Sequence, residues 1–265
     1  MKKSPSINHV TSRISNTVLQ EGLIVDRNWL RQRGVSTTAI DYYLRSGKLA
    51  SYAHGLYRIP GPPLKWQNIV HSLNVLDYNT HIGHATALTF HGFDHYLRLG
   101  KKVSIMLYSL KRLPQWVDKI DTIPSIKRMK PNPFDDNEIG TENVPFGTWD
   151  WPIRYSSAER AFIEFASTID TEVQISQTLK MLEGAVNLRP RILQTLLQAC
   201  NSIKTKRLFL WLARTAGHSW YKHLDVSTID LGKGKRQIVV GGMLDVEYFI
   251  TVPREVQDEI PESKF

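Results

Sequence analysis

Apolar residues recur at helical spacing three times near the start of the chain. The pattern predicts helices over 11–22, 27–33 and 37–46, with Asp26 and Ser36 as N-caps of the second and third. A glycine ends each of the first two helices, so the second and third are joined by a tight turn. Helix, tight turn and helix in this order form the helix-turn-helix pattern.

Two short predicted strands, 47–52 and 56–59, follow the third helix and enclose Ala53-His54-Gly55, where glycine supplies the turn. A hairpin in this position is typical of a winged helix, in which the second helix of the pair enters the major groove of DNA. A three-helix subdomain that only packs against the rest of the chain is the alternative interpretation.

Polar side chains fall on one face of the predicted helix over 37–46. Its outward-facing residues are expected to meet base edges or phosphates, and the guanidinium of Arg45 could contact guanine through two hydrogen bonds, worth about 1–3 kcal/mol of discrimination. Asp41 lies on the same face, where it either accepts a hydrogen bond from cytosine or pairs with Arg45, four residues later, and we expect the pair. Lys48, His54 and Arg58 lie on or beside the hairpin and are expected to contact backbone phosphates. The predicted DNA-binding residues are Ser36, Thr37, Thr38, Tyr42, Arg45, Lys48, His54 and Arg58.

The run Pro60–Pro63 interrupts any helix or central strand and stiffens the chain. We therefore predict a DNA-binding domain over 1–62 and a second domain over 65–265. Beyond the linker, Ser156 and Glu159 have the spacing of a capping box at the start of a helix. Further helices are predicted over 66–76, 84–90, 171–186, 190–199 and 204–216, and strands over 103–108, 227–231, 236–240 and 248–252. Together these elements predict an α+β fold with an N-terminal winged helix-turn-helix and a larger mixed α/β C-terminal domain.

The net charge of +9 is unevenly distributed. Residues 1–60 carry +6, residues 61–130 carry +6, and residues 131–265 carry −3. A basic N-terminal half suggests a polyanion-binding region next to a module with another task, although surface charge that only keeps the protein soluble is the alternative. The basic residues spread over 98–130 could extend a DNA footprint or form the solvated face of a sheet.

Several functional classes are disfavoured by the sequence. The single cysteine, Cys200, excludes an intrachain disulfide and a cysteine-based zinc finger. The longest apolar run, Leu208–Ala213, is too short to span a membrane, so a soluble cytoplasmic protein is expected. No motif indicates a cofactor.

Three motifs resemble catalytic or metal sites but are incomplete. His81, His84, His91 and His95 lack the glutamate of a His-Glu-x-x-His site, and glycines interrupt the helix that would carry them. Residues 232–235 lack the spacing of a phosphate loop, so a basic hairpin turn is predicted there. Asp245 and Glu247 form an acidic pair like part of a nuclease metal site, but the lysine that completes the acid-x-lysine pattern is absent. We therefore expect no metal, no catalytic residues and no enzymatic activity.

Motifs across nearly the whole chain resemble the AbiEi-type antitoxins of bacterial type IV toxin-antitoxin (abortive infection, phage defence) systems. The N-terminal similarity lies in Leu30-x-x-x-Gly34-Val35-Ser36 and Gly55-Leu56-Tyr57-Arg58. The more specific C-terminal similarity lies in Ser157–Phe162, Leu188–Arg191, Lys204–Leu212, Asp230–Gln237 and Ile250–Pro253.

This resemblance implies two functions. The winged helix would bind inverted repeats in the promoter of its own operon and repress it, and the C-terminal domain would counteract a nucleotidyltransferase toxin without needing a stable complex. A second hypothesis makes the C-terminal module an enzyme or RNA-binding domain that acts on the toxin's target. Its candidate antitoxin residues are Lys204, Lys206, Arg207 and Arg236, for which solvated surface is the alternative. A third is a transcription factor whose C-terminal domain senses a ligand.

Overall fold

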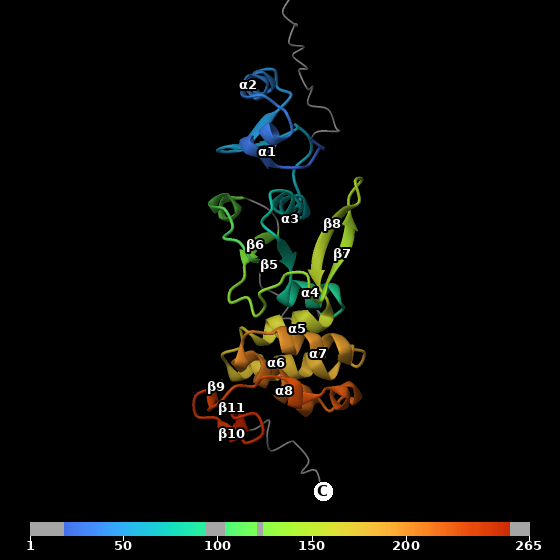
Figure 1. The fold of residues 1–265 in the computed structure, drawn as a ribbon, viewed down its shortest axis with the longest axis vertical. Helices are drawn as coiled ribbons and strands as arrows, with labels where there is room; N and C mark the ends of the chain where they lie inside the picture. The colour runs from blue at the N-terminus through green and yellow to red at the C-terminus, as the bar shows by residue number, and fades with distance from the viewer. Residues whose placement is uncertain (1–18, 94–103, 121–123, 255–265) are drawn as a thin grey trace, which may run out of the picture. The chain divides into compact units, whose positions relative to one another are not determined.

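The computed structural model describes residues 19–93, 104–120 and 124–254 and shows an α+β protein (Figure 1). The chain divides into two compact units after Tyr78, and residues 114–120 belong with the first unit. No helix within the described ranges is long and apolar enough to cross a membrane.

The first unit contains two helices joined by a turn and followed by a hairpin. Apolar side chains, including Ile24, Leu30, Ile40 and Leu49, form its core. Its elements are β1 (Val25–Asp26), α1 (Arg27–Gln32), α2 (Thr37–Arg45), β2 (Ala50–Ala53), β3 (Leu56–Arg58), α3 (Trp66–Val75) and a 3-10 turn over Gln115–Lys119. The strands form an antiparallel sheet in the order β1-β3-β2.

Helix α3 belongs to this first unit although it lies beyond the proline-rich linker. The Oγ of Ser72 accepts a hydrogen bond from the backbone N–H of Ile24 at 2.9 Å, and both residues are buried. The compact unit therefore extends past the predicted domain boundary at 62–65, while the functional division of the chain stays a prediction.

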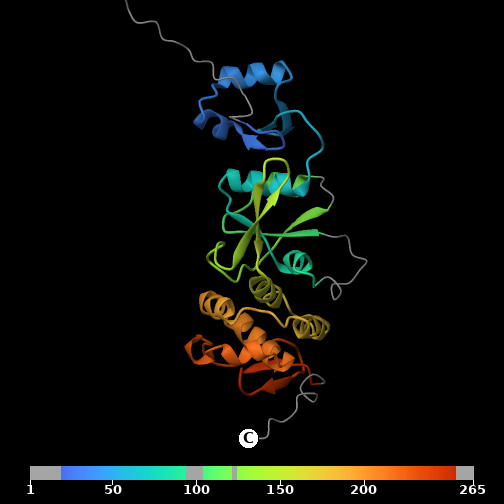
Figure 2. The same cartoon turned by 90° about the vertical axis from the view of Figure 1, so that its right-hand side faces the viewer.

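The second unit is built on a five-stranded mixed sheet in the order β6-β5-β4-β8-β7. Its strands are β4 (Thr80–Ile82), β5 (Ser104–Ser109), β6 (Ser125–Arg128), β7 (Thr141–Phe146) and β8 (Trp151–Ser156). Its helices are α4 (His84–Phe90), α5 (Ala158–Ala166), α6 (Glu172–Glu183), α7 (Pro190–Ala199) and α8 (Ile203–Ala216). Figure 2 shows the last four helices, in yellow to orange, gathered next to a small red sheet. That sheet has the order β10-β11-β9, from β9 (Arg236–Gln237), β10 (Met243–Asp245) and β11 (Ile250–Val252).

Several expectations need correction. The cap of α5 is Ser157, whose side chain accepts the N–H of Arg160, while the hydroxyl of Ser156 points to Glu164. The expected strand over 227–231 begins instead as a 3-10 turn, Val226–Thr228. Residues 227–231 form no strand that could pair with β9, whose neighbour in the sheet is β11, so residues 232–235 do not form a hairpin turn. The helix expected over 11–22 lies mostly outside the described residues, and 19–22 form a bend and a turn.

Candidate nucleic-acid interface

Helix α2 presents most of the side chains predicted to contact DNA. Ile40 and Tyr43 are buried and fix the orientation of the helix. At its start the Oγ of Ser36 accepts the N–H of Ala39 at 3.2 Å, which makes Ser36 the N-cap and leaves the first turn open to solvent. The exposed residues of this face are Thr37, Thr38, Tyr42 and Arg45.

Asp41 does not pair with Arg45 as expected. Its carboxylate accepts a hydrogen bond from Arg27 at 2.9 Å, and Arg27 also contacts the hydroxyl of Tyr57 at 3.4 Å. The Nε of Arg45 instead donates to the backbone oxygen of Asp41 at 3.3 Å. Arg27 therefore balances the carboxylate of Asp41, and the terminal nitrogens of Arg45 make no hydrogen bond or ion pair with any residue that the structure describes.

Two further exposed side chains lie on and beside the hairpin, His54 in its turn and Lys48 shortly before β2. Gly55 has a φ of +75°, which a glycine adopts without strain, and it places His54 at the exposed tip. The Nζ of Lys48 lies 6.0 Å from the ring centre of Tyr43, and Lys48 is exposed. Both side chains are open to solvent.

Arg58 is used differently from the expectation. Its two terminal nitrogens donate to the backbone oxygens of Gly61 and Pro62, at 2.8 and 2.9 Å. The guanidinium thus ties the linker to β3, so its hydrogen-bonding capacity is largely used inside the unit. The structure adds Arg31 and Arg33, exposed at the end of α1, which were not among the predicted DNA-binding residues. The sequence feature that could have identified them is the pair of arginines shortly before Gly34, at the end of the predicted helix.

A closed cluster of polar side chains lies inside the second unit. Glu164 of α5 accepts hydrogen bonds from the Nε of Arg160 at 2.8 Å and from the hydroxyl of Ser156 at 2.9 Å. The Nε2 of His81 lies 2.8 Å from the same carboxylate, and the backbone N–H of His84 donates to it at 2.9 Å. All five residues are buried, so the cluster joins β4, α4, β8 and α5 and offers no surface to a ligand.

The charge states in this cluster follow from burial and pairing. Burial alone would raise the pKa of Glu164, but His81 and Arg160 outweigh it and lower that pKa to about 2. Burial lowers the pKa of His81, so a neutral imidazole donates to an ionised carboxylate. Burial also lowers the pKa of His84 to about 4, against the opposing charge of Glu164 and with a smaller contribution from Lys127.

We expect acid to destabilise the protein from about pH 6.5 downward. The unfolded chain protonates His84 near pH 6.5, whereas the folded chain does so only near pH 4. The contribution of neutral His84 to the free energy of unfolding is therefore complete above pH 6.5 and is lost as the pH falls toward 4. The contribution of ionised Glu164 is lost in the same way as the pH falls below about 4.5. Urea unfolding at a series of pH values should show a shallower dependence of stability on pH for His84→Asn, because asparagine does not titrate. Asparagine suits this position because it tolerates the positive φ. If the variant shows the same dependence of stability on pH as the wild type, His84 does not have a lowered pKa in the folded protein.

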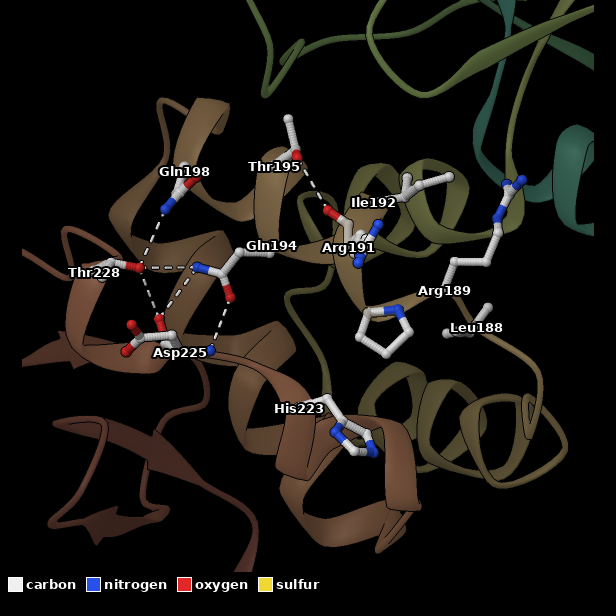
Figure 3. A pocket seen from close by; sticks show the side chains of 11 residues that line it. Leu188, Arg189, Arg191, Ile192, Gln194, Thr195, Gln198, His223, Asp225 and Thr228 are labelled. Atoms are coloured by element: carbon white, nitrogen blue, oxygen red, sulfur yellow. Dashed lines mark hydrogen bonds between the residues drawn. The ribbon is translucent and has the colours of Figure 1, made fainter.

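A groove of about 1200 Å³ runs along α7 on the second unit (Figure 3). The amide of Gln194 spans one wall, since it donates to the oxygens of Asp225 and Thr228 and accepts the N–H of Asp225 at 2.9 Å. Arg189 lies at the other end, where it pairs with Glu159 at 2.9 Å. Arg191 and His223 also line the groove and are exposed.

The four candidate antitoxin residues are not equivalent. Lys206 and Arg207 are buried at 4% and 3% exposure, whereas Lys204 and Arg236 are half-buried. The Nζ of Lys206 donates to the backbone oxygen of Asp230 at 3.1 Å. Lys206 and Arg207 therefore shape the protein and do not form a solvated surface.

Arg207 organises the loop over 230–236. Its Nε donates to the oxygen of Leu231 at 2.7 Å and its Nη2 to that of Gly232 at 3.0 Å. Its Nη1 contacts the oxygens of Gly234 and Phe249. One side chain thus satisfies four backbone carbonyls and holds the loop in one conformation.

The motifs that resembled metal or nuclease sites have structural partners. Arg214 pairs with both Asp245 and Glu247, so each carboxylate has a cationic partner and one of the two negative charges is balanced. The Nε2 of His91 lies 2.9 Å from the backbone oxygen of Ser156. Within the described ranges no group of three or more metal-ligating side chains is found, and His95 lies outside those ranges.

Comparisons with known proteins place the chain in a family. Residues 100–253 match the model described as transcriptional regulator, AbiEi antitoxin, type IV TA system, and residues 10–99 match the AbiEi antitoxin N-terminal domain. A comparison with curated proteins gives no match. The crystal structure of the RV2827C protein from Mycobacterium tuberculosis is similar in fold, with 16% identity, a TM-score of 0.50, and coverage of 87% of this chain and 86% of that chain. Because the two family models together account for residues 10–253, the chain belongs to the AbiEi antitoxin family of type IV toxin-antitoxin transcriptional regulators.

Proposed function

We propose that this antitoxin represses its own operon by binding inverted repeats in promoter DNA through a winged helix within residues 1–62. The observation that carries the proposal is the exposed face of α2, capped by Ser36 and placed between a preceding helix and a following hairpin. The N-terminal residues of a second helix in this arrangement are those that reach base edges in the major groove.

The side chains of this face divide into two kinds of contact. Thr37, Thr38, Tyr42 and Arg45 would meet bases and nearby phosphates, and Arg45 would supply discrimination. Lys48 and His54 on the hairpin, with Arg31 on α1, would contact the backbone and make binding dependent on salt. Arg58 would act indirectly, because it fixes the linker beside the hairpin.

We further propose that residues 65–265 neutralise a nucleotidyltransferase toxin encoded with this protein, and that neutralisation is not enzymatic. The family descriptions as antitoxin and transcriptional regulator support this division of labour. A protein that binds its own promoter would act in the bacterial cytoplasm.

Arg45→Ala should weaken binding to the promoter fragment about tenfold or more, because it removes hydrogen bonds worth about 1–3 kcal/mol. Arg45→Lys should keep part of the affinity through charge but lose sequence discrimination, because lysine lacks the planar fork of arginine. Footprinting and mobility shifts at several salt concentrations would measure both effects. Lys180→Ala, which removes an exposed cation on α6 of the second unit, is the matched control and should bind as the wild type does. An unchanged footprint and affinity for Arg45→Ala would refute the assignment of α2 as the recognition helix.

A further inference from the structure

The loop over 230–236 is held in place by two cations that are themselves buried. Lys206 binds the carbonyl of Asp230, and Arg207 binds those of Leu231, Gly232 and Gly234. Removing an ammonium and a guanidinium from water has a desolvation cost, which these carbonyls offset. The loop is therefore tied to α8 through these backbone oxygens, which face the two buried cations.

The charged side chains of this loop are cationic except for the exposed Asp230. Lys233 and Lys235 are exposed, Arg236 and Lys204 are half-buried, and none of the four forms an ion pair with a residue in the described part of the chain. The pKa of Arg207 is lowered by burial and then by the charge of Arg236, which reflects the crowding of like charges.

The three nearby carboxylates only partly balance the six cations of this loop and of the start of α8, since one of the three negative charges is already balanced by Arg214. The carboxylate of Asp230 accepts the N–H of Gly232 at 2.8 Å, and Asp245 and Glu247 both pair with Arg214. The loop therefore presents an excess of positive charge, although residues 131–265 as a whole carry −3.

An exposed aromatic ring lies directly beside this loop. Phe249 is 49% exposed and has a φ of +50°, a backbone conformation that is strained for a bulky residue. Its neighbour Tyr248 is buried, donates its N–H to Asp245 at 2.8 Å and shares a hydrogen bond with the hydroxyl of Tyr221. Anchoring of Tyr248 in the core thus leaves the ring of Phe249 in solvent.

Two contacts join the residue that carries the ring to the cations. The carbonyl of Phe249 accepts the N–H of Arg236 at 2.9 Å, and it shares the Nη1 of Arg207 with the carbonyl of Gly234. Because β9 and β11 run parallel, Lys235 and Phe249, which precede these two strands, lie at the same end of the small sheet, and Lys233 lies two residues before Lys235.

We propose that Lys233, Lys235 and Phe249 form a binding surface for single-stranded RNA. Cations that follow a phosphate backbone, combined with an aromatic ring on which a base can stack, are the two elements that single-strand binding requires. The bases of duplex DNA are stacked inside the helix, where an exposed aromatic side chain cannot stack on them. RNA loops and ends, in contrast, have unstacked bases that are accessible to such a ring. The proposal does not depend on promoter binding by α2, because it rests on residues of the second unit.

The test measures binding of the full chain to a labelled single-stranded RNA of about 12 nucleotides, with DNA of the same sequence, single-stranded and duplex, as parallel probes. Phe249→Leu should weaken RNA binding about tenfold, because it keeps an apolar side chain and removes the stacking face, whereas Phe249→Trp should retain binding. Lys233→Gln with Lys235→Gln should reduce the slope of log affinity against log salt by about 0.7 for each phosphate that the variant no longer neutralises.

Three further variants separate function from folding. Phe249→Gly should weaken RNA binding while the chain stays folded, since glycine adopts the positive φ of this position without strain. Val186→Ala removes another exposed apolar side chain of the second unit, and Lys222→Gln another exposed lysine, and both should bind RNA as the wild type does.

The proposal is overturned if the wild type does not bind the RNA, or if Phe249→Leu binds it within twofold of the wild type. Equal binding of single-stranded DNA, or a parallel loss of duplex DNA binding in the Phe249 variants, would also overturn the assignment to RNA. Loss of toxin neutralisation in cells with unchanged RNA binding would assign the surface to a protein partner instead.

Discussion

Glu164→Gln is expected to lower the free energy of unfolding by about 3–5 kcal/mol. The carboxylate is fully buried and is the counter-charge of the fully buried Arg160. A neutral amide of the same shape would leave that guanidinium uncompensated and would place an NH2 group against the donors of His81 and Ser156. There is no room for rearrangement, since a Cβ on Gly83 would already lie 2.1 Å from a Glu164 oxygen.

Urea unfolding monitored by tryptophan fluorescence would measure this destabilisation. The matched control is Glu183→Gln, which makes the same change at an exposed position of α6 and should alter stability by no more than about 0.5 kcal/mol. If both variants unfold at the same urea concentration as the wild type, the buried cluster does not hold β4, α4, β8 and α5 together.

Arg207→Met is expected to cost about 3 kcal/mol and to release the loop over 230–236. Methionine preserves much of the length and the apolar contacts of the side chain but removes every hydrogen bond to the carbonyls of Leu231, Gly232 and Gly234. Water can bind the carbonyls of the exposed glycines once the loop opens, which limits the cost. Hydrogen exchange should therefore increase in this loop and in β9 more than in the sheet of β4 and β5.

Arg191→Met provides the comparison, because Arg191 is an exposed arginine of the same unit whose side chain forms no hydrogen bond or ion pair with the residues that the structure describes. It should leave both stability and exchange near the wild-type values. Equal effects of the two substitutions would show that the contacts of Arg207 do not order the loop.

The N-terminal part of the fold follows closely from local sequence signals. Asp26 and Ser36 cap α1 and α2 as expected, since each side-chain oxygen accepts the N–H three residues later. Glycine at 55 marks the hairpin turn, and the apolar spacing of α2 gives its buried side. These signals act over a few residues, so they can be recognised without knowing what the element packs against.

Much of the second unit could not be predicted because its elements depend on distant partners. Strand β4 is only three residues long and is defined by pairing with β5 on one side and β8 on the other. Strands β7 and β8 carry prolines that obscure the strand pattern, yet they pair over six residues. The wrong choice of Ser156 as the cap has the same origin, since its hydroxyl is needed by Glu164 eight residues away.

The exposure of the predicted DNA-binding residues could be predicted more readily than their hydrogen-bond partners. The polar face of α2 is exposed as expected, but the partner of Asp41 comes from α1, which sequence spacing within one helix could not reveal. Arg207 lies in a motif that was recognised, but its four carbonyl partners lie 24 to 42 positions away. Phe249 gave no signal in the sequence, because its exposure results from the anchoring of Tyr248.

Promoter reading and toxin neutralisation are proposed to reside in different parts of the chain. The decisive experiment places Arg45→Ala in cells that carry a promoter reporter and, separately, the inducible toxin. We predict that the variant loses repression of the reporter but rescues growth as well as the wild type at equal protein level. Repression that survives the substitution, or rescue that is lost together with repression, would show that the two functions are not divided in this way.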